Sequence, residues 1–308
     1  MTHEHLLIMH LRPARRKARK AAIVEVLCLL RDLNPVELAG GPLSEQGGLF
    51  WIRIPDATLE SVAARFLSLG YTQAIDAVEP LLDYPARRPH GEGTPRVTRW
   101  RGRSWSLVRI YAEDAETLRE RAADRRLFFL ETGDGVVRPI KGYRGDGQPL
   151  SRRGLPVYDA RLLVNLVFTP AKGTFLDPFA GVGGIVLEAI QSGWDVLSAD
   201  IDPALRHGLA HLGASHSVAD ARQLPIASAS VDAIATEPPY DEQARDVLIP
   251  AFQELHRVLK VGGRLAVLCA AWQADALRQQ GVVSGLTPYL DSPIDRKGVA
   301  VVALAWQK

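Results

Sequence analysis

The chain of 308 residues exceeds the usual single-domain length of roughly 100 to 200 residues, so its length predicts two domains. A hydrophobic share of 47% allows a sizeable core, while no apolar run approaches the ~20 residues that cross a bilayer. The net charge of +2 is unevenly spread: residues 1–155 carry 25 Lys and Arg against 19 Asp and Glu, and residues 156–308 carry 12 against 16. A basic front half and an acidic back half are typical of a polyanion-binding module joined to a small-molecule pocket.

Cysteine and histidine usage indicates neither a disulfide nor a metal. Cys28 and Cys269 each stand inside an apolar run, as small buried hydrophobic residues do. His3, His5 and His10 are close in sequence, but no further ligands follow at metal-like spacing, so we expect no metal site. The first basic cluster follows a short apolar run, the reverse of a secretory signal, which favours a cytoplasmic protein.

In chain order, the front half begins with an alternation of strands and helices. The expected elements are strand 6–11, helix 21–33, strand 49–54 and helix 58–69. This order within a short span predicts a small α/β sandwich.

The rest of the front half is rich in turn residues. We expect a turn-rich connection over 84–103, a strand over 106–111 and a charged helix over 115–125. A stretch rich in Gly, Pro and Arg then follows Leu130. We place the domain boundary there, near residue 150, giving domains 1–150 and 151–308.

The back half is more regular, because strands alternate with helices. The expected helices are 158–168, 184–192, 203–212, 246–259 and 272–280. The expected strands are 174–176, 195–199, 217–218, 231–236 and 264–268, followed by two late runs, 286–290 and 298–306. This order predicts a parallel, doubly wound sheet that the late runs close as an edge hairpin.

The turn DPFAGVGG follows a predicted strand and opens a predicted helix. Gly181 and Gly183 lack a Cβ, so they can take positive φ and let a ligand approach the backbone, while the helix N-terminus offers free N–H groups. Such turns serve nicotinamide and flavin cofactors as well as other nucleotides. The turn alone therefore predicts only a nucleotide-type cofactor.

Acidic residues at the ends of the next strands narrow the choice of cofactor. Asp200 stands about twenty residues after the glycine turn, where a carboxylate can accept both hydroxyls of a ribose. Asp202 precedes a proline and is expected to start a helix. Asp220 ends the following strand, where it would lie beside an adenine edge or cap a short loop.

The segment TEPPY, at 236–240, indicates the reaction. Consecutive prolines fix an extended backbone and remove competing N–H groups. An amine on an aromatic base is a weak nucleophile, because its lone pair is delocalised into the ring. If Glu237 and the carbonyl of Pro238 accept its two N–H bonds, the lone pair can be directed at a methyl group while Tyr240 stacks on the base.

The segment 149–280 resembles the class I S-adenosylmethionine-dependent methyltransferases that modify exocyclic amines. DARLLVNLV, DPFAGVGGIVLEA, SADIDP, ADARQLP, EPPY and VLKVGGRL occur in that family's order, and the first two are most similar to the THUMP-class tRNA guanine-N2 methyltransferases. The resemblance implies a catalytic loop of Glu237, Pro238, Pro239 and Tyr240. It implies cofactor contacts from Asp177, Pro178, Phe179, Ala180, Gly181, Gly183, Asp200, Ile201, Asp220 and Ala221.

The resemblance also implies the fold. We expect a Rossmann-like domain with a seven-stranded, mostly parallel sheet and an antiparallel edge hairpin, preceded by a smaller α+β domain that is ferredoxin-like over about 1–80. Residues 95–145 are interpreted as a degenerate THUMP-like part. In this family the motif of the catalytic loop normally begins with Asp or Asn, and Glu237 is one methylene longer.

Two basic clusters of the front half are candidates for RNA binding. One interleaves Arg99, Arg101 and Arg103 with Trp100, a mixture suited to phosphates and unstacked bases, and the other includes Arg16 and Lys17. The leading hypothesis is a monomeric, cytoplasmic enzyme that methylates N2 of guanine in tRNA. Some relatives work with a small activating partner. The alternatives are a DNA adenine-N6 or cytosine-N4 methyltransferase, and a weakly catalytic cofactor- and RNA-binding protein.

Overall fold

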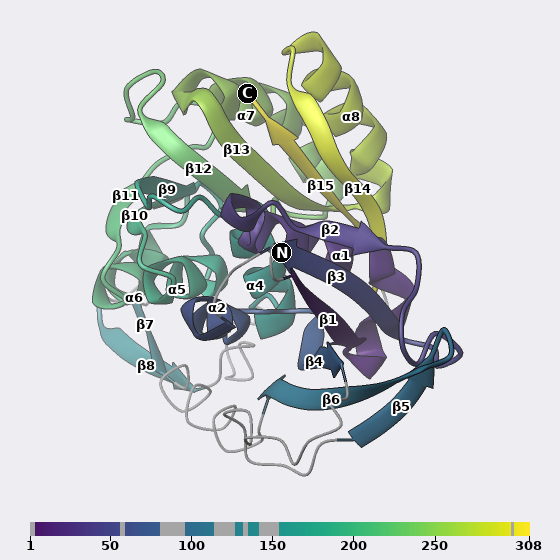
Figure 1. Cartoon of the computed structure of the whole chain (residues 1–308). Coiled ribbons are helices and arrows are strands. Elements are labelled where there is room, and N and C mark those ends of the chain that lie inside the picture. Colours follow the sequence, from purple (N-terminus) through teal and green to yellow (C-terminus); the bar gives the residue numbers. More distant parts are fainter. Residues whose placement is uncertain are drawn as a thin grey trace. The chain divides into compact units, whose positions relative to one another are not determined.

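The chain forms two compact units, residues 1–117 and 118–308, which are described in turn (Figure 1). The computed structural model describes residues 4–55, 59–80, 96–113, 127–131, 135–141, 154–296 and 299–308. The predicted boundary near residue 150 and the predicted helix 115–125 lie outside these residues. No helix within the described ranges is long and apolar enough to span a membrane.

The first unit is an antiparallel sheet with a ferredoxin-like beginning. Its first elements are β1 (Glu4–Leu11), η1 (Pro13–Ala18), α1 (Arg19–Leu29), η2 (Arg31–Leu33), β2 (Val36–Leu38), β3 (Leu49–Pro55), α2 (Leu59–Phe66) and β4 (Thr72–Pro80). The strand order is β2-β3-β1-β4, and β1 pairs antiparallel with both β3 and β4. A β-α-β-β-α-β chain in this order has the ferredoxin-like arrangement, so the prediction for residues 1–80 is confirmed.

Burial explains why β1 is the centre of this sheet. Leu7, Ile8 and Met9 are fully buried, as expected of a strand that is covered on both sides. The helix predicted over 21–33 is divided into α1 and η2, and it ends where Asn34 takes a left-handed φ of 50°.

A hairpin extends the sheet beyond β4 and corrects one prediction. Residues 96–100 were expected to belong to a turn-rich connection, yet they form β5 (Arg96–Trp100), which pairs antiparallel with β6 (Arg103–Ala112). The two turn residues, Arg101 and Gly102, have φ of 50° and 73°. Two positive φ values give the turn type that matches strand twist, but this turn has Arg-Gly where Asn-Gly is the usual signal.

The second unit contains the predicted doubly wound sheet. Its strands are β9 (Thr174–Asp177), β10 (Asp195–Asp200), β11 (Ser215–Val218), β12 (Val231–Thr236), β13 (Leu259–Ala270), β14 (Thr287–Arg296) and β15 (Val299–Gln307). The order is β11-β10-β9-β12-β13-β15-β14. The first five strands run parallel, whereas β15 pairs antiparallel with β13 and β14. The Rossmann-like sheet with its antiparallel edge hairpin is confirmed.

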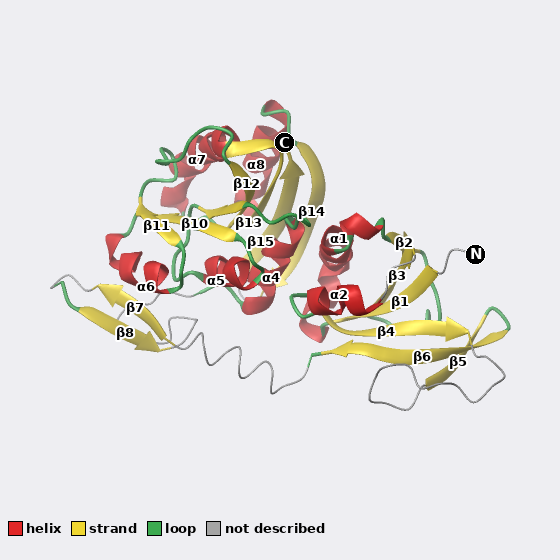
Figure 2. Cartoon of the chain, turned by 60° about the vertical axis from the view of Figure 1, so that its left-hand side comes forward, coloured by secondary structure: helices red, strands yellow, loops and turns green. Residues whose placement is uncertain are grey.

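Helices cover both faces of this sheet. The α-helices are α4 (Val157–Leu166), α5 (Gly184–Gln191), α6 (Arg206–His211), α7 (Arg245–Val258) and α8 (Ala274–Val283), with short 3-10 turns η3 (Pro203–Leu205), η4 (Glu242–Ala244) and η5 (Ala271–Gln273). Figure 2 shows α7 and α8 on one face and α4, α5 and α6 on the other.

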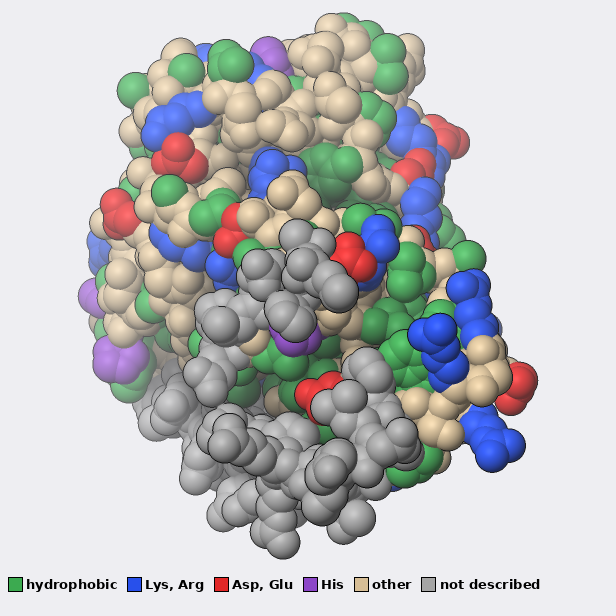
Figure 3. Space-filling view, in the orientation of Figure 1, with side chains coloured by type: hydrophobic (Ala, Val, Ile, Leu, Met, Phe, Trp, Pro, Cys, Tyr) green, Lys and Arg blue, Asp and Glu red, His purple; other side chains and the backbone are tan. Residues whose placement is uncertain are grey.

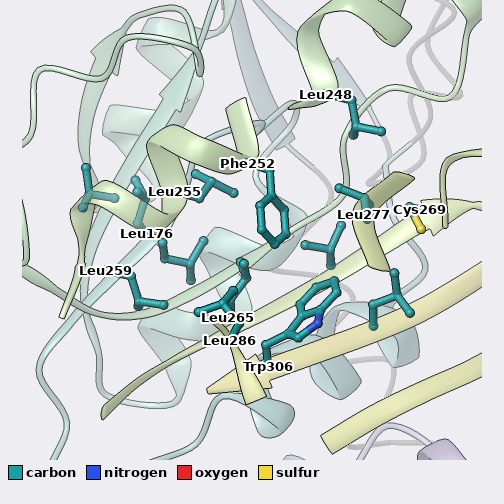
Figure 4. Packing of buried hydrophobic residues seen from close by; sticks show 14 of the residues in the cluster. Leu176, Leu248, Phe252, Leu255, Leu259, Leu265, Cys269, Leu277, Leu286 and Trp306 are labelled. Carbon is teal, nitrogen blue, oxygen red and sulfur yellow. The ribbon is translucent and has the colours of Figure 1, made fainter. Parts of the chain in front are cut away.

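The core beneath α7 follows from helical spacing. Leu248, Phe252 and Leu255 recur every three or four residues, so they share the face that packs on the sheet. The Phe252 ring meets the Trp306 ring edge-on at a centroid distance of 5.4 Å (Figure 4). Cys269 is buried in the same cluster, as predicted for a small hydrophobic residue.

A second hairpin, β7 (Leu127–Glu131) and β8 (Val137–Lys141), packs on α6 of the second unit. Phe128 lies over Gly208, where an added Cβ would stand 2.2 Å from the ring. Phe129 meets His211 edge-on at a centroid distance of 4.7 Å. The segment 95–145 is therefore shared: β5 and β6 belong to the first unit, and β7 and β8 to the second.

Candidate active site

The glycine turn lies between β9 and α5, and its two glycines serve different purposes. Gly181 and Gly183 both have positive φ, 51° and 77°. A Cβ on Gly183 would stand 2.4 Å from Leu212, so this glycine is needed for packing, whereas a Cβ on Gly181 would meet nothing within 4 Å. The N–H of Ala180 donates to the carbonyl of Ala199 at 3.0 Å, which ties the turn to the end of β10. The open side of the turn is thus at Gly181.

Asp177 is a buried acid at the end of β9. One carboxylate oxygen accepts the Thr236 hydroxyl at 2.7 Å and the Phe179 N–H at 3.3 Å. Burial raises the pKa of Asp177 to about 7, and the charges of Asp200 and Glu237 add to the rise. No cation within the described residues forms an ion pair with Asp177. The site therefore contains an acid that a cationic ligand group would stabilise in its ionised form.

Asp200, at the end of β10, connects the strand to the glycine turn. One carboxylate oxygen accepts the Gly181 N–H at 2.8 Å, and the other accepts the Asp202 N–H at 3.0 Å. Asp202 itself caps the following turn by accepting the Ala204 N–H at 2.9 Å, as predicted. The neighbouring Ile201 is 68% exposed.

Asp220 follows β11 and is held by its own neighbour. Arg222 donates to both carboxylate oxygens, to Oδ1 at 3.0 Å and to Oδ2 at 2.6 Å, and this contact lowers the pKa of Asp220. Ala221 is buried, and the loop is joined to β10 because the Ala219 N–H donates to the Asp200 carbonyl at 3.0 Å. The loop is fixed near Asp200, with the Asp220 carboxylate occupied by an arginine.

The proline loop after β12 is held in place by hydrogen bonds from residues of η5, which follows β13. The buried Gln273 donates to the carbonyl of Pro239 at 2.8 Å, and the indole N–H of Trp272 donates to the carbonyl of Tyr240 at 3.2 Å. Within the described part of the chain, the carbonyl of Pro238 accepts no hydrogen bond. The loop therefore presents one unused acceptor beside Glu237.

Glu237 belongs to a network that the sequence did not reveal. Its Oε1 atom accepts the hydroxyl of Tyr240 in a short hydrogen bond and the Nη1 donor of Arg296 at 2.7 Å. Arg296 also lies 3.5 Å from the fully buried Asp159 of α4. Burial raises the pKa of Glu237, and the charge of Arg296 opposes this rise. The Tyr240 hydroxyl is directed at the carboxylate, and the predicted stacking of its ring stays a prediction.

These groups converge because of the sheet topology. Asp177, Asp200 and Glu237 stand at or just after the carboxyl ends of neighbouring parallel strands, and the hydrogen bond from Thr236 joins two of the three loops. The strand order reverses between β9 and β12, which is where open α/β sheets bind ligands. Asp159 and Arg296 come from α4 and β14, elements whose relation to the loop no local motif shows.

The predicted RNA-binding residues lie in the first unit. Arg99, Arg101 and Arg103 are exposed around the β5–β6 turn, and the Arg101 guanidinium stacks 4.7 Å from the centroid of the half-buried Trp100 ring. The exposed pair Arg16 and Lys17 belongs to η1. Figure 3 shows Lys and Arg side chains along the right-hand side of the view.

Comparison with known proteins agrees with this description. Residues 176–267 match the family model of the methyltransferase domain. Over 88 residues, 26% of each chain, the protein is 43% identical to a tRNA (guanine(10)-N2)-dimethyltransferase of Methanothermobacter thermautotrophicus. Over 178 residues it is 33% identical to the enzyme of the same name from Pyrococcus abyssi, covering 53% of this chain and 46% of the relative.

The chain thus spans less than half the length of the curated relatives it matches. Among solved structures, TrmN from Thermus thermophilus is similar over 99% of this chain and 100% of its own, with 17% identity and a TM-score of 0.49. The predicted resemblance to class I methyltransferases is confirmed by the family model that matches residues 176–267, and the curated relatives that the chain matches are named as guanine-N2 enzymes.

Proposed function

We propose that the chain transfers a methyl group from S-adenosylmethionine to an exocyclic amine of RNA, namely N2 of guanine in tRNA. One observation carries the proposal: the glycine turn that is joined to Asp200 and the proline loop with Glu237 stand on adjoining parallel strands. The first arrangement suits a nucleoside cofactor and the second a planar amine. The names of the curated relatives support this choice of substrate.

The residues at the strand ends fit the proposed cofactor. The open side of the turn at Gly181 admits a ligand close to the backbone, and both oxygens of Asp200 are held in place by backbone N–H groups. Asp200 would bind the ribose, and Asp177 with the turn through Gly183 would hold the methionine part. Asp220 and Ala221 would meet the adenine. When bound, S-adenosylmethionine supplies an electrophilic methyl group on its sulfonium and leaves as a thioether.

The proline loop would prepare the amine for attack. The Oε2 atom of Glu237 and the carbonyl of Pro238 are unused by the described residues, so each can accept one N–H of the target amine. With both N–H bonds occupied, the nitrogen lone pair is turned away from the ring and toward the cofactor. In the transfer, a nitrogen–carbon bond would form as the sulfonium's sulfur–carbon bond breaks, and the nitrogen would release one proton to the solvent. The contribution of the loop is positioning and electrostatics.

The first unit would bind the tRNA. The exposed arginines around the β5–β6 turn can contact phosphates, and Trp100 with its stacked Arg101 offers a surface for an unpaired base. Arg16 and Lys17 add a second basic position. A cytoplasmic monomer, assisted by a small activating partner, is the form in which we expect the enzyme to act.

Transfer of label from methyl-labelled S-adenosylmethionine tests the proposal. The wild type should label bulk tRNA and leave duplex DNA unlabelled. Glu237→Gln should leave DNA unlabelled and label tRNA only at a small residual rate, while it binds the cofactor as tightly as the wild type. If duplex DNA is labelled, the result would support the alternative that the protein is a DNA adenine-N6 or cytosine-N4 methyltransferase. If the wild type is inactive and the Glu237→Asp variant is active, the protein binds the cofactor and RNA but has lost most of its catalytic activity.

A further inference from the structure

The side chain of Glu237 has one oxygen occupied by protein groups and one without a protein partner. Its Oε1 atom accepts from Tyr240 and from Arg296, whereas its Oε2 atom makes no hydrogen bond within the described residues. A glutamate has one more rotatable bond than an aspartate, so its carboxylate needs more restraint to stay in one place. The two donors to Oε1 supply that restraint.

We propose that Arg296 is a positioning residue, which holds the carboxylate of Glu237 so that Oε2 faces the target amine. This inference rests on the proposed function, because it specifies how that site is held. Arg296 ends β14 of the edge hairpin, far from the proline loop in sequence, and its guanidinium reaches both Glu237 at 2.7 Å and the Tyr240 hydroxyl at 3.2 Å.

Asp159 fixes the other side of the guanidinium. Its carboxylate is fully buried in α4, and it lies 3.5 Å from the Nε atom of Arg296. The planar guanidinium can therefore contact an acid on two sides at once, which a lysine ammonium on a flexible stem does less rigidly. Three elements that are distant in sequence, α4, the loop after β12 and the end of β14, meet at this one side chain.

Arg296 also opposes the rise in the pKa of Glu237 that burial causes. Among the residues that the structure describes, the groups that face Glu237 are Arg296, Asp159, Tyr240 and Asp177, and Arg296 is the cation of this set. Burial and the neighbouring acids favour the protonated form of Glu237, which cannot accept the N–H of the amine through its protonated oxygen. Loss of the arginine charge should therefore raise the pKa of Glu237 and move the acid limb of the pH–rate profile to higher pH.

The test compares single-turnover methylation of bulk tRNA by Arg296→Met, Arg296→Lys and the control Arg278→Met across pH. Arg278 also anchors β14, through Asp291 at 2.7 Å, but it lies outside the site. We expect Arg296→Met to slow methyl transfer about 10- to 100-fold with its acid limb at higher pH, and the cofactor dissociation constant to stay within twofold. Arg296→Lys should recover part of the rate and keep the acid limb of its pH–rate profile where the wild type has it. Arg278→Met should match the wild type in both rate and acid limb.

A double mutant separates action through Glu237 from a general effect on the fold. In the Glu237→Gln background, Arg296→Met should change the residual rate less than threefold, because the group it positions is gone. An acid limb that stays in place in Arg296→Met, or a full rate loss in both backgrounds, would overturn the inference.

Crystal structures of the wild type and Arg296→Met give a second readout that needs no activity. The inference predicts that the Glu237 carboxylate turns away by an ångström or more in the variant, and an unmoved carboxylate would contradict it. If the wild type methylates neither tRNA nor DNA, the proposed function fails, and the carboxylate position still decides whether Arg296 holds Glu237.

Discussion

Replacing Asp177 by asparagine should stabilise the second unit above pH 7 while weakening its affinity for S-adenosylmethionine. Burial raises the pKa of this carboxyl from 3.8 to about 7. At about 1.4 kcal/mol per pH unit, ionising it in the folded unit costs about 4 kcal/mol. An asparagine resembles the protonated acid and can still accept from Thr236 and Phe179, so it avoids this cost.

The sign of the pH dependence follows from the raised pKa. Between pH 3.8 and about 7 the folded unit keeps the proton and the unfolded chain does not, so the free energy of unfolding falls as pH rises through this window and then levels off. The Asp177→Asn variant has no carboxyl at this position, so its free energy of unfolding does not fall in this way. Its stability advantage over the wild type should therefore grow by about 2 to 3 kcal/mol between pH 5 and pH 8.

Amide hydrogen exchange of peptides from β12, measured without cofactor, reports the stability of this unit alone. The control is Asp195→Asn, because it removes an exposed carboxylate from the same sheet. The same variants are then titrated with S-adenosylmethionine by calorimetry at pH 8, where Asp177→Asn should bind about 10- to 100-fold more weakly through loss of a charge-assisted contact. A stability difference that does not grow with pH would refute the account of Asp177 as a buried acid.

Three further substitutions test the site and its surroundings. Asp200→Ala should weaken cofactor binding by about 10- to 100-fold in calorimetry, and unchanged affinity would remove it from the site. Gly183→Ala should lower the thermal midpoint more than Gly181→Ala, because only the former brings a Cβ to 2.4 Å from Leu212; equal midpoints would contradict this packing. Gly208→Ala should speed hydrogen exchange in β7 and β8, since its Cβ would collide with a phenylalanine ring at 2.2 Å; unchanged exchange would show that the hairpin does not depend on this contact.

The sequence predicted the second unit well because its signals are local and repeated. Apart from β11, which reads SHSV, each strand of the parallel sheet contains an apolar run, and the edge hairpin follows as two late apolar runs. The glycine turn was predicted for the same reason, since Gly181 and Gly183 do take positive φ. Asp202 caps the next turn, as the following proline suggested.

What the sequence missed depends on contacts between distant residues. Asp159 contacts Arg296, which in turn contacts the Glu237 carboxylate, although Asp159 and Arg296 stand 137 positions apart in the printed sequence. Asp159 begins the DARLLVNLV motif, but the motif does not indicate a contact with the proline loop, and nothing around Arg296 marks it as part of the site. The β5 strand was missed for a different reason, because its arginines and its Arg-Gly turn resemble a polar connection.

Asp220 illustrates a third limit. Its position after β11 was predicted, but its pairing with Arg222 was not, although the two residues are only two positions apart in the sequence. An acid that stands two residues from an arginine can either pair with it or bind a ligand, and the spacing is the same in both cases. Only the rotamers of the two side chains distinguish these arrangements.

The central claim is methyl transfer to N2 of guanine in tRNA, and mass spectrometry of nucleosides tests it most directly. Bulk tRNA is incubated with S-adenosylmethionine and either the wild type or Glu237→Gln, then digested to nucleosides. We expect N2-methylated guanosine to increase with the wild type and to stay at the starting level with the variant. An increase in a different methylated nucleoside, or no increase with the wild type, would contradict the account.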